Sequence, residues 1–315
     1  MDQTNGRNSD GVGIRLIKQA YGLARKVRAR FSNQRPSPEE YWDVQDADIY
    51  IISFPKSGRT WLRLMLGKYI TDLASIAFDE LMEVYDITKP LKTIPTVAFV
   101  HDGSNSRVTE SPGELKKRRD RYRKKKIVFL ARDLRDTLVS YYFHLQRRVG
   151  KYQGDISSFI RDERHGMPKA VAFLNVWAQS RRVPKDFLLM RYEDMRQNPA
   201  GELARLLEFM EIPIEDHLVK AAVEFASFEN MKKMEKNNKF ASKNRIGVKS
   251  IEDAESFKVR KGQVRGYHAY LSRDDVAYLT GFINTKLSPY FGYRYLWEEE
   301  ESSHKEFPQS HQNEG

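Results

Sequence analysis

The residues that decide the fold are Ile49-Tyr-Ile-Ile-Ser-Phe-Pro-Lys-Ser-Gly-Arg-Thr-Trp61, followed at once by Leu62-Arg-Leu-Met-Leu-Gly-Lys-Tyr-Ile70. Residues 49–54 are rich in β-branched and aromatic side chains, which is typical of a buried strand, and Pro55 ends it because proline has no backbone N–H to donate. Ser57 is the expected helix N-cap, and Gly58 lets the backbone approach a ligand closely. Apolar residues recur through residues 62–70, so the stretch predicts a strand, a tight turn and a helix.

The predicted turn is a candidate anion site. A helix N-terminus presents backbone N–H groups and the positive end of the helix dipole, and together these bind phosphate-like groups. Four side chains of the turn add donors or charge, and they belong to Lys56, Ser57, Arg59 and Thr60. The Walker A loop, G-x-x-x-x-G-K-[ST], does not fit because the lysine here precedes the glycine of the turn.

The order Pro-Lys-Ser-Gly-x-Thr-Trp at residues 55–61 resembles the 5′-phosphosulfate loop of sulfotransferases that use 3′-phosphoadenosine 5′-phosphosulfate (PAPS). The family pattern is close to Pro-Lys-Ser-Gly-Thr-Thr-Trp, so Arg59 is the one departure, a second cation that either tightens donor binding or points outward. The resemblance implies that Lys56 is catalytic and neutralises the bridging oxygen as the phosphate leaves. It also implies that the donor is bound by Lys56, Ser57, Gly58, Arg59, Thr60 and Trp61.

The composition narrows the class of protein. Of the 315 residues 40% are hydrophobic, which is enough for a sizeable core. Lys and Arg number 54 against 43 Asp and Glu, and the net charge of +11 favours an anionic partner. The absence of cysteine excludes disulfides and thiolate catalysis, and no apolar run approaches the roughly 20 residues of a membrane span. We therefore expect a cytoplasmic protein.

The chain divides into one predicted domain and two extensions. Residues 41–296 form the expected sulfotransferase domain, residues 1–40 a basic extension, and residues 297–315 an acidic and polar disordered tail. Within the extension, residues 11–31 place apolar side chains at three- and four-residue spacing among arginines and lysines. This pattern predicts a basic amphipathic helix that either makes peripheral contact with an anionic membrane or docks on the body of the protein.

The candidate general base is His101, which follows the short β-type run at residues 96–100. Ligands gather beyond strand ends in open α/β sheets, and an imidazole titrates near neutral pH. The family resemblance also places a catalytic histidine there, although its usual Lys-Thr-His context is Phe-Val-His here. A surface histidine is the alternative, and Glu83 or Asp79 would then be the base, because Golgi-type sulfotransferases use a carboxylate.

A second phosphate element follows a basic run at residues 116–126, which we expect to be a solvated helix face. Residues 127–131 predict a buried strand that ends at Arg132, and a helix begins at residue 133. An arginine fork and the hydroxyl of Ser140 suit a phosphate. The pattern resembles the family's 3′-phosphate element Arg-x-x-x-Asp-x-x-x-Ser-x-Tyr, with Arg132, Asp136, Ser140 and Tyr142 in register, and Ser140 is counted among the catalytic residues.

Three later motifs also resemble the family. Tyr192 opens a Tyr-Glu-Asp-Met motif near the adenine, after a predicted strand at residues 186–191. Ser227 and Phe228 lie, within a helix predicted to run on towards Lys236, in an Ala-Ser-Phe-x-x-Met segment that matches an adenine contact. Phe228 and Trp61 are expected to stack on the two faces of the purine. The triplet Arg260, Lys261 and Gly262 ends a long predicted loop and is implied to close over the 3′-phosphate.

The resemblance covers about residues 45–290 and implies a single α/β domain of the three-layer, P-loop-like class, with a central parallel sheet of about five strands flanked by helices. It implies sulfuryl transfer from PAPS to a hydroxyl or amine without a metal, with Lys56, His101 and Ser140 as catalytic residues. The acceptor classes left open are glycans, glycolipids, small alcohols and phenols; no nucleic-acid partner is expected, and the oligomeric state is open. The alternatives are a metal-dependent P-loop kinase or NTPase, and a basic non-enzymatic binder of anionic membranes or nucleic acid.

Overall fold

The computed structural model describes residues 47–76, 81–104, 120–237 and 262–294. The expected amphipathic helix at residues 11–31, the extensions at 1–40 and 297–315, Asp79, Arg260 and Lys261 lie outside these residues. In the described part of the chain, no helix is both long and apolar enough to cross a membrane.

Four parallel strands form the central sheet in the order β2-β1-β3-β4. Their bounds are β1 (Ile49–Ser53), β2 (Val97–Val100), β3 (Lys126–Ala131) and β4 (Asp186–Arg191). The parallel α/β sheet flanked by helices is confirmed, with four strands among the described residues where about five were expected. The predicted strand at residues 186–191 has the observed bounds of β4.

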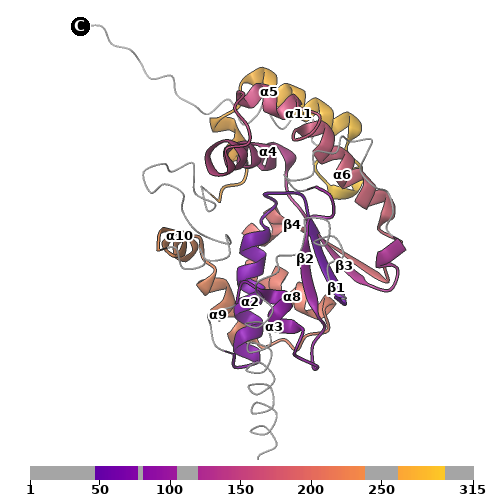
Figure 1. Cartoon of the computed structure of the whole chain (residues 1–315), viewed down its shortest axis with the longest axis vertical. Helices are drawn as coiled ribbons and strands as arrows, with labels where there is room; N and C mark the ends of the chain where they lie inside the picture. The colour runs from indigo at the N-terminus through magenta and orange to yellow at the C-terminus, as the bar shows by residue number, and fades with distance from the viewer. Residues whose placement is uncertain (1–46, 77–80, 105–119, 238–261, 295–315) are drawn as a thin grey trace, which may run out of the picture.

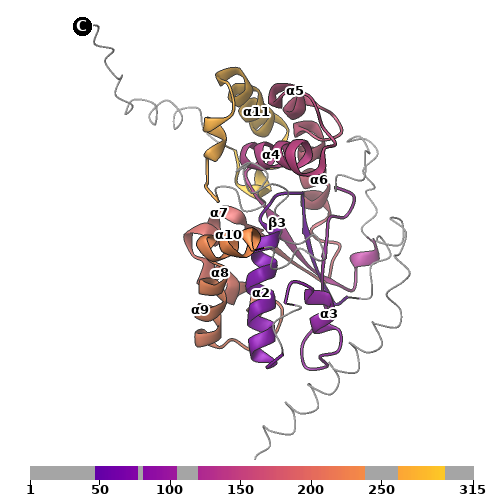
Figure 2. The same cartoon turned by 60° about the vertical axis from the view of Figure 1, so that its left-hand side comes forward.

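Helices cover both faces of the sheet, so the domain has three layers (Figures 1 and 2). Alternate residues of the strands point to opposite faces. The helix bounds are α2 (Arg59–Leu73), α3 (Val84–Thr88), α4 (Leu134–Phe143), α5 (Ile156–Arg161), α6 (Met167–Ser180), α7 (Tyr192–Gln197), α8 (Pro199–Phe209), α9 (Asp216–Phe225), α10 (Phe228–Lys236) and α11 (Arg273–Lys286). Tyr50 and Ile52 of β1 belong to a core with α4, α6 and α11, whereas Ile49 and Ile51 belong to a core with α2, α8 and α9.

Two sequence predictions need correction. The helix expected to run on through Ser227 towards Lys236 is two helices, because α9 ends at Phe225 and the Ser227 side chain accepts the N–H of Asn230 to cap α10. The described part of the basic run is solvated, with Arg121, Arg123 and Lys124 exposed, but it does not form the expected helix face. It contains a short 3₁₀ helix, η3 (Asp120–Tyr122), and its last residue opens β3.

The strand order fixes where a ligand site forms. From β1 the chain moves to one side for β2 and to the other side for β3, so the topology switches between β1 and β3. Ligands of open α/β sheets bind beyond the carboxyl ends of the strands at such a switch point. The turn with Lys56 follows the end of β1, and Arg132 follows the end of β3. The two predicted phosphate elements therefore lie together beyond the carboxyl ends of β1 and β3.

Candidate active site

The turn between β1 and α2 has an unusual backbone. Lys56 has φ 70° and Gly58 has φ 95°, so two positions of a five-residue turn are left-handed. A side chain at Gly58 is excluded in addition by space, because a Cβ there would lie 2.6 Å from Cδ2 of Tyr192. The helix begins at Arg59 with Gly58 as its N-cap, one residue later than expected, so the prediction of Ser57 as N-cap is wrong. Glycine suits this cap because the required φ is positive.

Arg132 connects the turn to the segment that follows Gly262. Its Nη1 donates to the main-chain oxygen of Lys56 at 3.4 Å, and its Nη2 donates to that of Gln263 at 3.1 Å. The guanidinium also lies 4.2 Å from the centre of the Tyr192 ring. Its Nε is buried without a hydrogen-bond partner. A buried guanidinium N–H that lacks an acceptor fits a bound anion, because leaving such a donor unpaired is costly.

Asp136 holds the same segment in place from α4. Its Oδ2 accepts the N–H of Arg265 at 2.9 Å, and its Oδ1 accepts that of Tyr267 at 3.0 Å. Nη2 of Arg132, which precedes the helix by two residues, lies 3.6 Å from Oδ2 of Asp136. Burial raises the pKa of the Asp136 carboxyl, against the opposing effect of Arg132 and of the two N–H donors. Ser140 is half-buried one turn further along the same helix face.

Aromatic rings surround the turn. Trp61 meets Tyr192 edge to face, with ring centres 5.8 Å apart, and the guanidinium of Arg196 lies 5.8 Å from the Trp61 ring. Burial raises the pKa of the Tyr192 phenol. Phe228, at the start of α10, packs against Gly262, where φ is 61° and a Cβ would lie 2.8 Å from the ring. The Gly58 turn, Tyr192, Arg132 and the segment that begins at Gly262 are thus connected by direct contacts.

His101 follows the end of β2, beside the end of β1. Its Nδ1 lies 3.0 Å from the main-chain oxygen of Ser53, the last residue of β1. A carbonyl oxygen only accepts, so Nδ1 carries the hydrogen and the neutral ring has its lone pair on Nε2. The Oγ of Ser104 donates to the oxygens of both His101 and Ser53, at 2.7 Å and 3.3 Å. The histidine is therefore fixed to the strand that leads into the Lys56 turn.

The turn after His101 is stabilised by two residues of the segment that precedes β3. Asp102 has φ 45° and a buried carboxylate, which pairs with the guanidinium of Arg121 and accepts the Tyr122 hydroxyl at 3.0 Å. The sequence did not single out these residues. Arg121 gave no signal because it lies within a dense basic run, where any one arginine is expected on the surface. Glu83, the alternative base, is the N-cap residue of α3.

A family model described as a sulfotransferase domain matches residues 46–291. The chain belongs to the sulfotransferase domain family. The resemblance read from the motifs is confirmed, and with it the enzyme class: the protein is a PAPS-dependent sulfotransferase. The catalytic roles of single residues and the acceptor are not fixed by this match.

Relatives in plants share the family. A flavonol 4′-sulfotransferase of Flaveria chlorifolia is 26% identical over 271 residues, which cover 79% of this chain and 82% of the relative. Cytosolic sulfotransferase 15 of Arabidopsis thaliana is 26% identical over 310 residues, covering 86% and 79%. A flavonol 3-sulfotransferase of Flaveria bidentis is 24% identical over 282 residues, covering 82% and 87%.

Solved structures share the fold. Retinol dehydratase in complex with androsterone and the inactive cofactor PAP has a TM-score of 0.55 at 17% identity, over 77% of this chain and 81% of that one. A mouse sulfotransferase complexed with PAP has a TM-score of 0.54 at 19% identity, over 79% and 90%. The P-loop-like sulfotransferase fold expected from the sequence is confirmed.

Asp133, the carboxylate that follows β3 in this sulfotransferase, has a structural role. Asp133 caps α4 by accepting the N–H of Arg135 at 2.8 Å, and its other oxygen pairs with the Arg135 guanidinium at 2.9 Å. Both side chains are buried. In a kinase or NTPase the residue at this place would hold magnesium. The ion pair with Arg135 occupies the carboxylate, which disfavours the metal-dependent alternative.

Aromatic residues continue beyond Ser140. Tyr141 and Tyr142 are buried, and the Tyr142 hydroxyl donates to the main-chain oxygen of Gly154 at 3.2 Å. A π-helix, η4 (His144–Val149), follows directly, and the His144 ring stacks on Tyr141 at 6.5 Å. Such π-helical turns are rare and are often found at functional sites. No residue pattern in the sequence indicated it.

Proposed function

We propose that this sulfotransferase holds PAPS across the switch point, with the 5′-phosphosulfate at the Lys56 turn and the 3′-phosphate at Arg132 and Ser140. The observation that carries this assignment is the position of Arg132. It contacts the main chain of both Lys56 and Gln263 and keeps a buried Nε without an acceptor. The side chains of Ser57 and Thr60 and the N-terminus of α2 complete the anion site.

The adenine contacts follow from the rings around the turn. Trp61 packs edge to face with Tyr192, and Phe228 packs on Gly262, next to the proposed 3′-phosphate site. We infer that the purine stacks between Trp61 and Phe228, with Ser227 and Tyr192 beside it. Gly262 ends the triplet with Arg260 and Lys261, whose side chains we propose to close over the 3′-phosphate. Arg59, the first residue of α2, adds a second cation next to the proposed 5′-phosphosulfate site.

The proposed reaction is an in-line displacement at sulfur. When bound, PAPS supplies an activated sulfuryl group whose bond to the 5′-phosphate oxygen breaks as the acceptor oxygen forms its bond to sulfur. Nε2 of His101 takes the acceptor proton, because the hydrogen bond to Ser53 fixes the lone pair on that nitrogen. Lys56 and the α2 N-terminus stabilise the negative charge on the leaving phosphate, and no metal is required.

We infer that the acceptor carries a hydroxyl group. The relatives named for flavonols act on hydroxyl-bearing compounds, and the partly exposed rings of Phe143 and Tyr270, 5.1 Å apart, offer aromatic surface near the carboxyl end of α4. These features favour a phenol or other small hydroxylated compound over a glycan or glycolipid. A cytoplasmic location agrees with the relatives named cytosolic. Membrane contact through residues 11–31 is a separate proposal, which vesicle binding by the full chain would test.

The test is thermal unfolding with adenosine 3′,5′-bisphosphate without metal, compared with ATP plus magnesium. A ligand at 100 times its dissociation constant adds about 2.7 kcal/mol to the free energy of unfolding, which raises the melting temperature by several degrees. We expect the bisphosphate to stabilise the protein, and Lys56→Ala and Arg132→Ala to weaken the effect. Lys220→Ala, on the exposed surface of α9, is the control. Stabilisation by magnesium-ATP alone would support the kinase alternative instead.

A further inference from the structure

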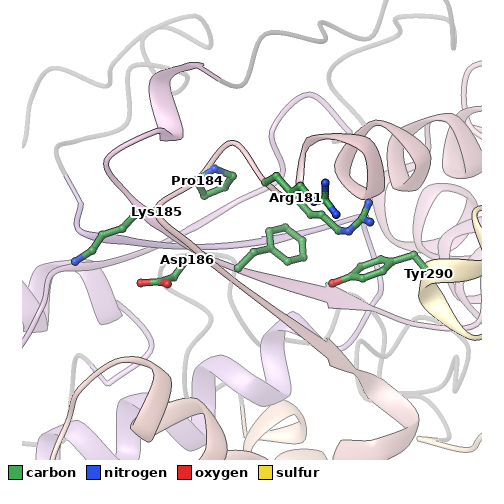
Figure 3. Close-up of a pocket in the computed structure, with 7 residues that line it drawn as sticks. Arg181, Pro184, Lys185, Asp186 and Tyr290 are labelled. Atoms are coloured by element: carbon green, nitrogen blue, oxygen red, sulfur yellow. The ribbon is translucent and has the colours of Figure 1, made fainter.

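A second candidate ligand site lies at the amino end of β4 (Figure 3). It is an open pocket of about 400 Å³. The residues that line it come from the turn between α6 and β4, from the first residues of β4 and from the chain after α11, and they are Arg181, Arg182, Pro184, Lys185, Asp186, Phe187 and Tyr290. Figure 3 shows Arg181 and Tyr290 towards one side of the pocket and Lys185 and Asp186 towards the other.

This pocket is separate from the active site. The PAPS elements follow the carboxyl ends of β1 and β3, whereas the pocket adjoins Asp186, the first residue of β4. The strands are parallel, so the two sites lie at opposite ends of the strands, the pocket at the amino ends and the active site at the carboxyl ends. Six residues of β4 span about 16 Å, which separates the pocket from the active-site edge. None of the residues assigned to donor binding lines it.

The pocket carries an excess of positive charge. Three of its lining side chains are cationic, those of Arg181, Arg182 and Lys185, and one is a carboxylate, that of Asp186. Nζ of Lys126 faces this carboxylate at 3.9 Å, so part of its charge is compensated from outside the pocket. Lys126 also pairs with Glu211 at 2.5 Å. A negatively charged ligand is therefore favoured by the local field.

One wall of the pocket is aromatic. The Phe187 and Tyr290 ring centres are 6.3 Å apart, and Phe187 is backed by the buried Trp177, also at 6.3 Å. Tyr290 is 36% exposed, which makes it one of three large hydrophobic side chains left exposed in the described part of the chain. The Arg181 guanidinium lies 4.9 Å from the Tyr290 ring centre. A cation beside an exposed ring presents charge and apolar surface to the same ligand.

The arginine is also held in place. Nη1 of Arg181 donates to the main-chain oxygen of Ala178 at 2.5 Å, at the end of α6. The turn is closed by the N–H of Val183, which donates to Ser180 at 2.9 Å, and the N–H of Lys185 donates to Lys125 at 3.0 Å. A fixed backbone and a fixed guanidinium lower the entropy cost of binding.

We propose that this pocket binds a small aromatic anion, such as an aryl sulfonate, aryl sulfate or aryl carboxylate. The anionic group contacts the guanidinium groups of Arg181 and Arg182, whose paired N–H donors match planar or tetrahedral oxyanions. The aromatic body lies against Phe187 and Tyr290. An inorganic anion would leave this wall uncovered, and a neutral aromatic compound would leave the cations without a partner. The proposal does not depend on the roles assigned at the active site.

The test is calorimetric titration of the full chain with 2-naphthalenesulfonate, with adenosine 3′,5′-bisphosphate present in saturating amount. The sulfonate carries a C–S bond and is not a sulfuryl donor. We compare the parent protein with Arg182→Gln/Lys185→Gln, which removes two exposed cations, and with Tyr290→Leu, which removes the exposed ring. Lys220→Gln/Arg273→Gln is the matched control, because both residues are exposed and lie on α9 and α11, away from the pocket lining.

We expect both pocket variants to weaken sulfonate binding by about tenfold or more and the control to leave it unchanged. Bisphosphate affinity and melting temperature should remain as in the parent protein. Equal sulfonate affinity in all variants, or no binding, would overturn the proposal. So would equally tight binding of inorganic sulfate or of neutral 2-naphthol, since the first needs no aromatic wall and the second needs no cation.

Discussion

The imidazole of His101 donates from Nδ1 to the main-chain oxygen of Ser53 over 3.0 Å, and this hydrogen bond ties the candidate base to the strand that precedes the Lys56 turn. Because the acceptor is a carbonyl, the neutral ring keeps its lone pair on Nε2. The same contact therefore determines both the position and the tautomer of the histidine. It connects β2 to β1 beyond the last paired residues of the two strands.

Replacing His101 by asparagine separates these two effects. The side-chain amide of Asn can donate to Ser53 from about the position of Nδ1, but it supplies no basic nitrogen. We expect His101→Asn to lower kcat by about 10²- to 10⁴-fold, the usual contribution of a general base. The melting temperature and the affinity for adenosine 3′,5′-bisphosphate should stay close to those of the parent protein.

The control is His101→Ala, which also loses the hydrogen bond and should cost about 1 kcal/mol of stability in addition. A His101→Asn enzyme with near-normal turnover would remove the histidine from the mechanism. Glu83→Gln would then be the next variant to assay, because Glu83 is the carboxylate alternative within the described residues.

Much of the fold was predictable because its signals are local. The strand, turn and helix around Lys56 follow from a β-branched run, a proline and an apolar periodicity, and the strand before Arg132 follows from an apolar run. The position of the cap at Gly58 was not predicted, because it depends on a left-handed φ and on the close approach of Tyr192, which comes from a distant part of the chain. The break at Ser227 was missed because the apolar periodicity continues across it.

Sequence motifs predicted which side chains belong to the candidate site, but not the main-chain atoms that these side chains contact. Arg132 and Asp136 stood in register, but their acceptor and donors at Gln263, Arg265 and Tyr267 are main-chain atoms, which leave no trace in a sequence. The same holds for the main-chain oxygen of Ser53 that binds His101. Contacts to the backbone depend on how distant segments pack, and this information is not present in any local pattern.

Gly58 and Gly103 provide a matched pair for testing the turn. Gly58 has φ 95° and a Cβ there would lie 2.6 Å from the Tyr192 ring, whereas Gly103 has φ 90° with nothing within 4 Å. Alanine at either position meets about 1 kcal/mol or more of left-handed strain. Only Gly58→Ala adds the steric clash, so we expect it to lower the melting temperature further and to weaken bisphosphate binding. Thermal melts and calorimetric titration of both variants measure this, and equal effects would contradict the importance of the Tyr192 contact.

Asp136 is expected to position the segment at Arg265 and Tyr267 rather than to react. An asparagine offers one acceptor oxygen where the carboxylate uses two, so Asp136→Asn leaves one N–H unpaired and weakens the contact to Arg132. We expect a loss of stability of about 1–3 kcal/mol and weaker bisphosphate binding. Thermal melts measure the stability, and calorimetric titrations measure the bisphosphate affinity. Both use the same samples, which are first checked by ultracentrifugation. Thr137→Ser, on the same helix, is the control, and a variant with unchanged bisphosphate affinity would argue against a positioning role.

Glu193 gives a prediction about pH. Its Oε1 accepts the N–H of Asp133 at 3.0 Å and its Oε2 accepts the hydroxyl of Tyr293 at 2.8 Å. Burial raises the pKa of this carboxyl, and burial together with Glu193 raises the pKa of Tyr293 well above its usual value. A raised pKa means that the folded state holds the proton more tightly than the unfolded state. This contribution to stability is present in full below the ordinary glutamate pKa and is lost as the pH rises through the raised value.

Glutamine at this position should remove that dependence. The Gln oxygen can accept from Asp133 while its amide donates to the Tyr293 oxygen, so both contacts survive without a buried charge. We therefore expect Glu193→Gln to unfold at a higher temperature than the parent protein near pH 8, with the advantage shrinking towards pH 4, where the parent carboxyl is protonated. Glu193→Ala, which breaks both contacts, should be less stable than the parent protein at every pH. If the melting temperatures of the parent protein and of Glu193→Gln differed by the same amount at every pH in this range, the raised pKa of Glu193 would be contradicted.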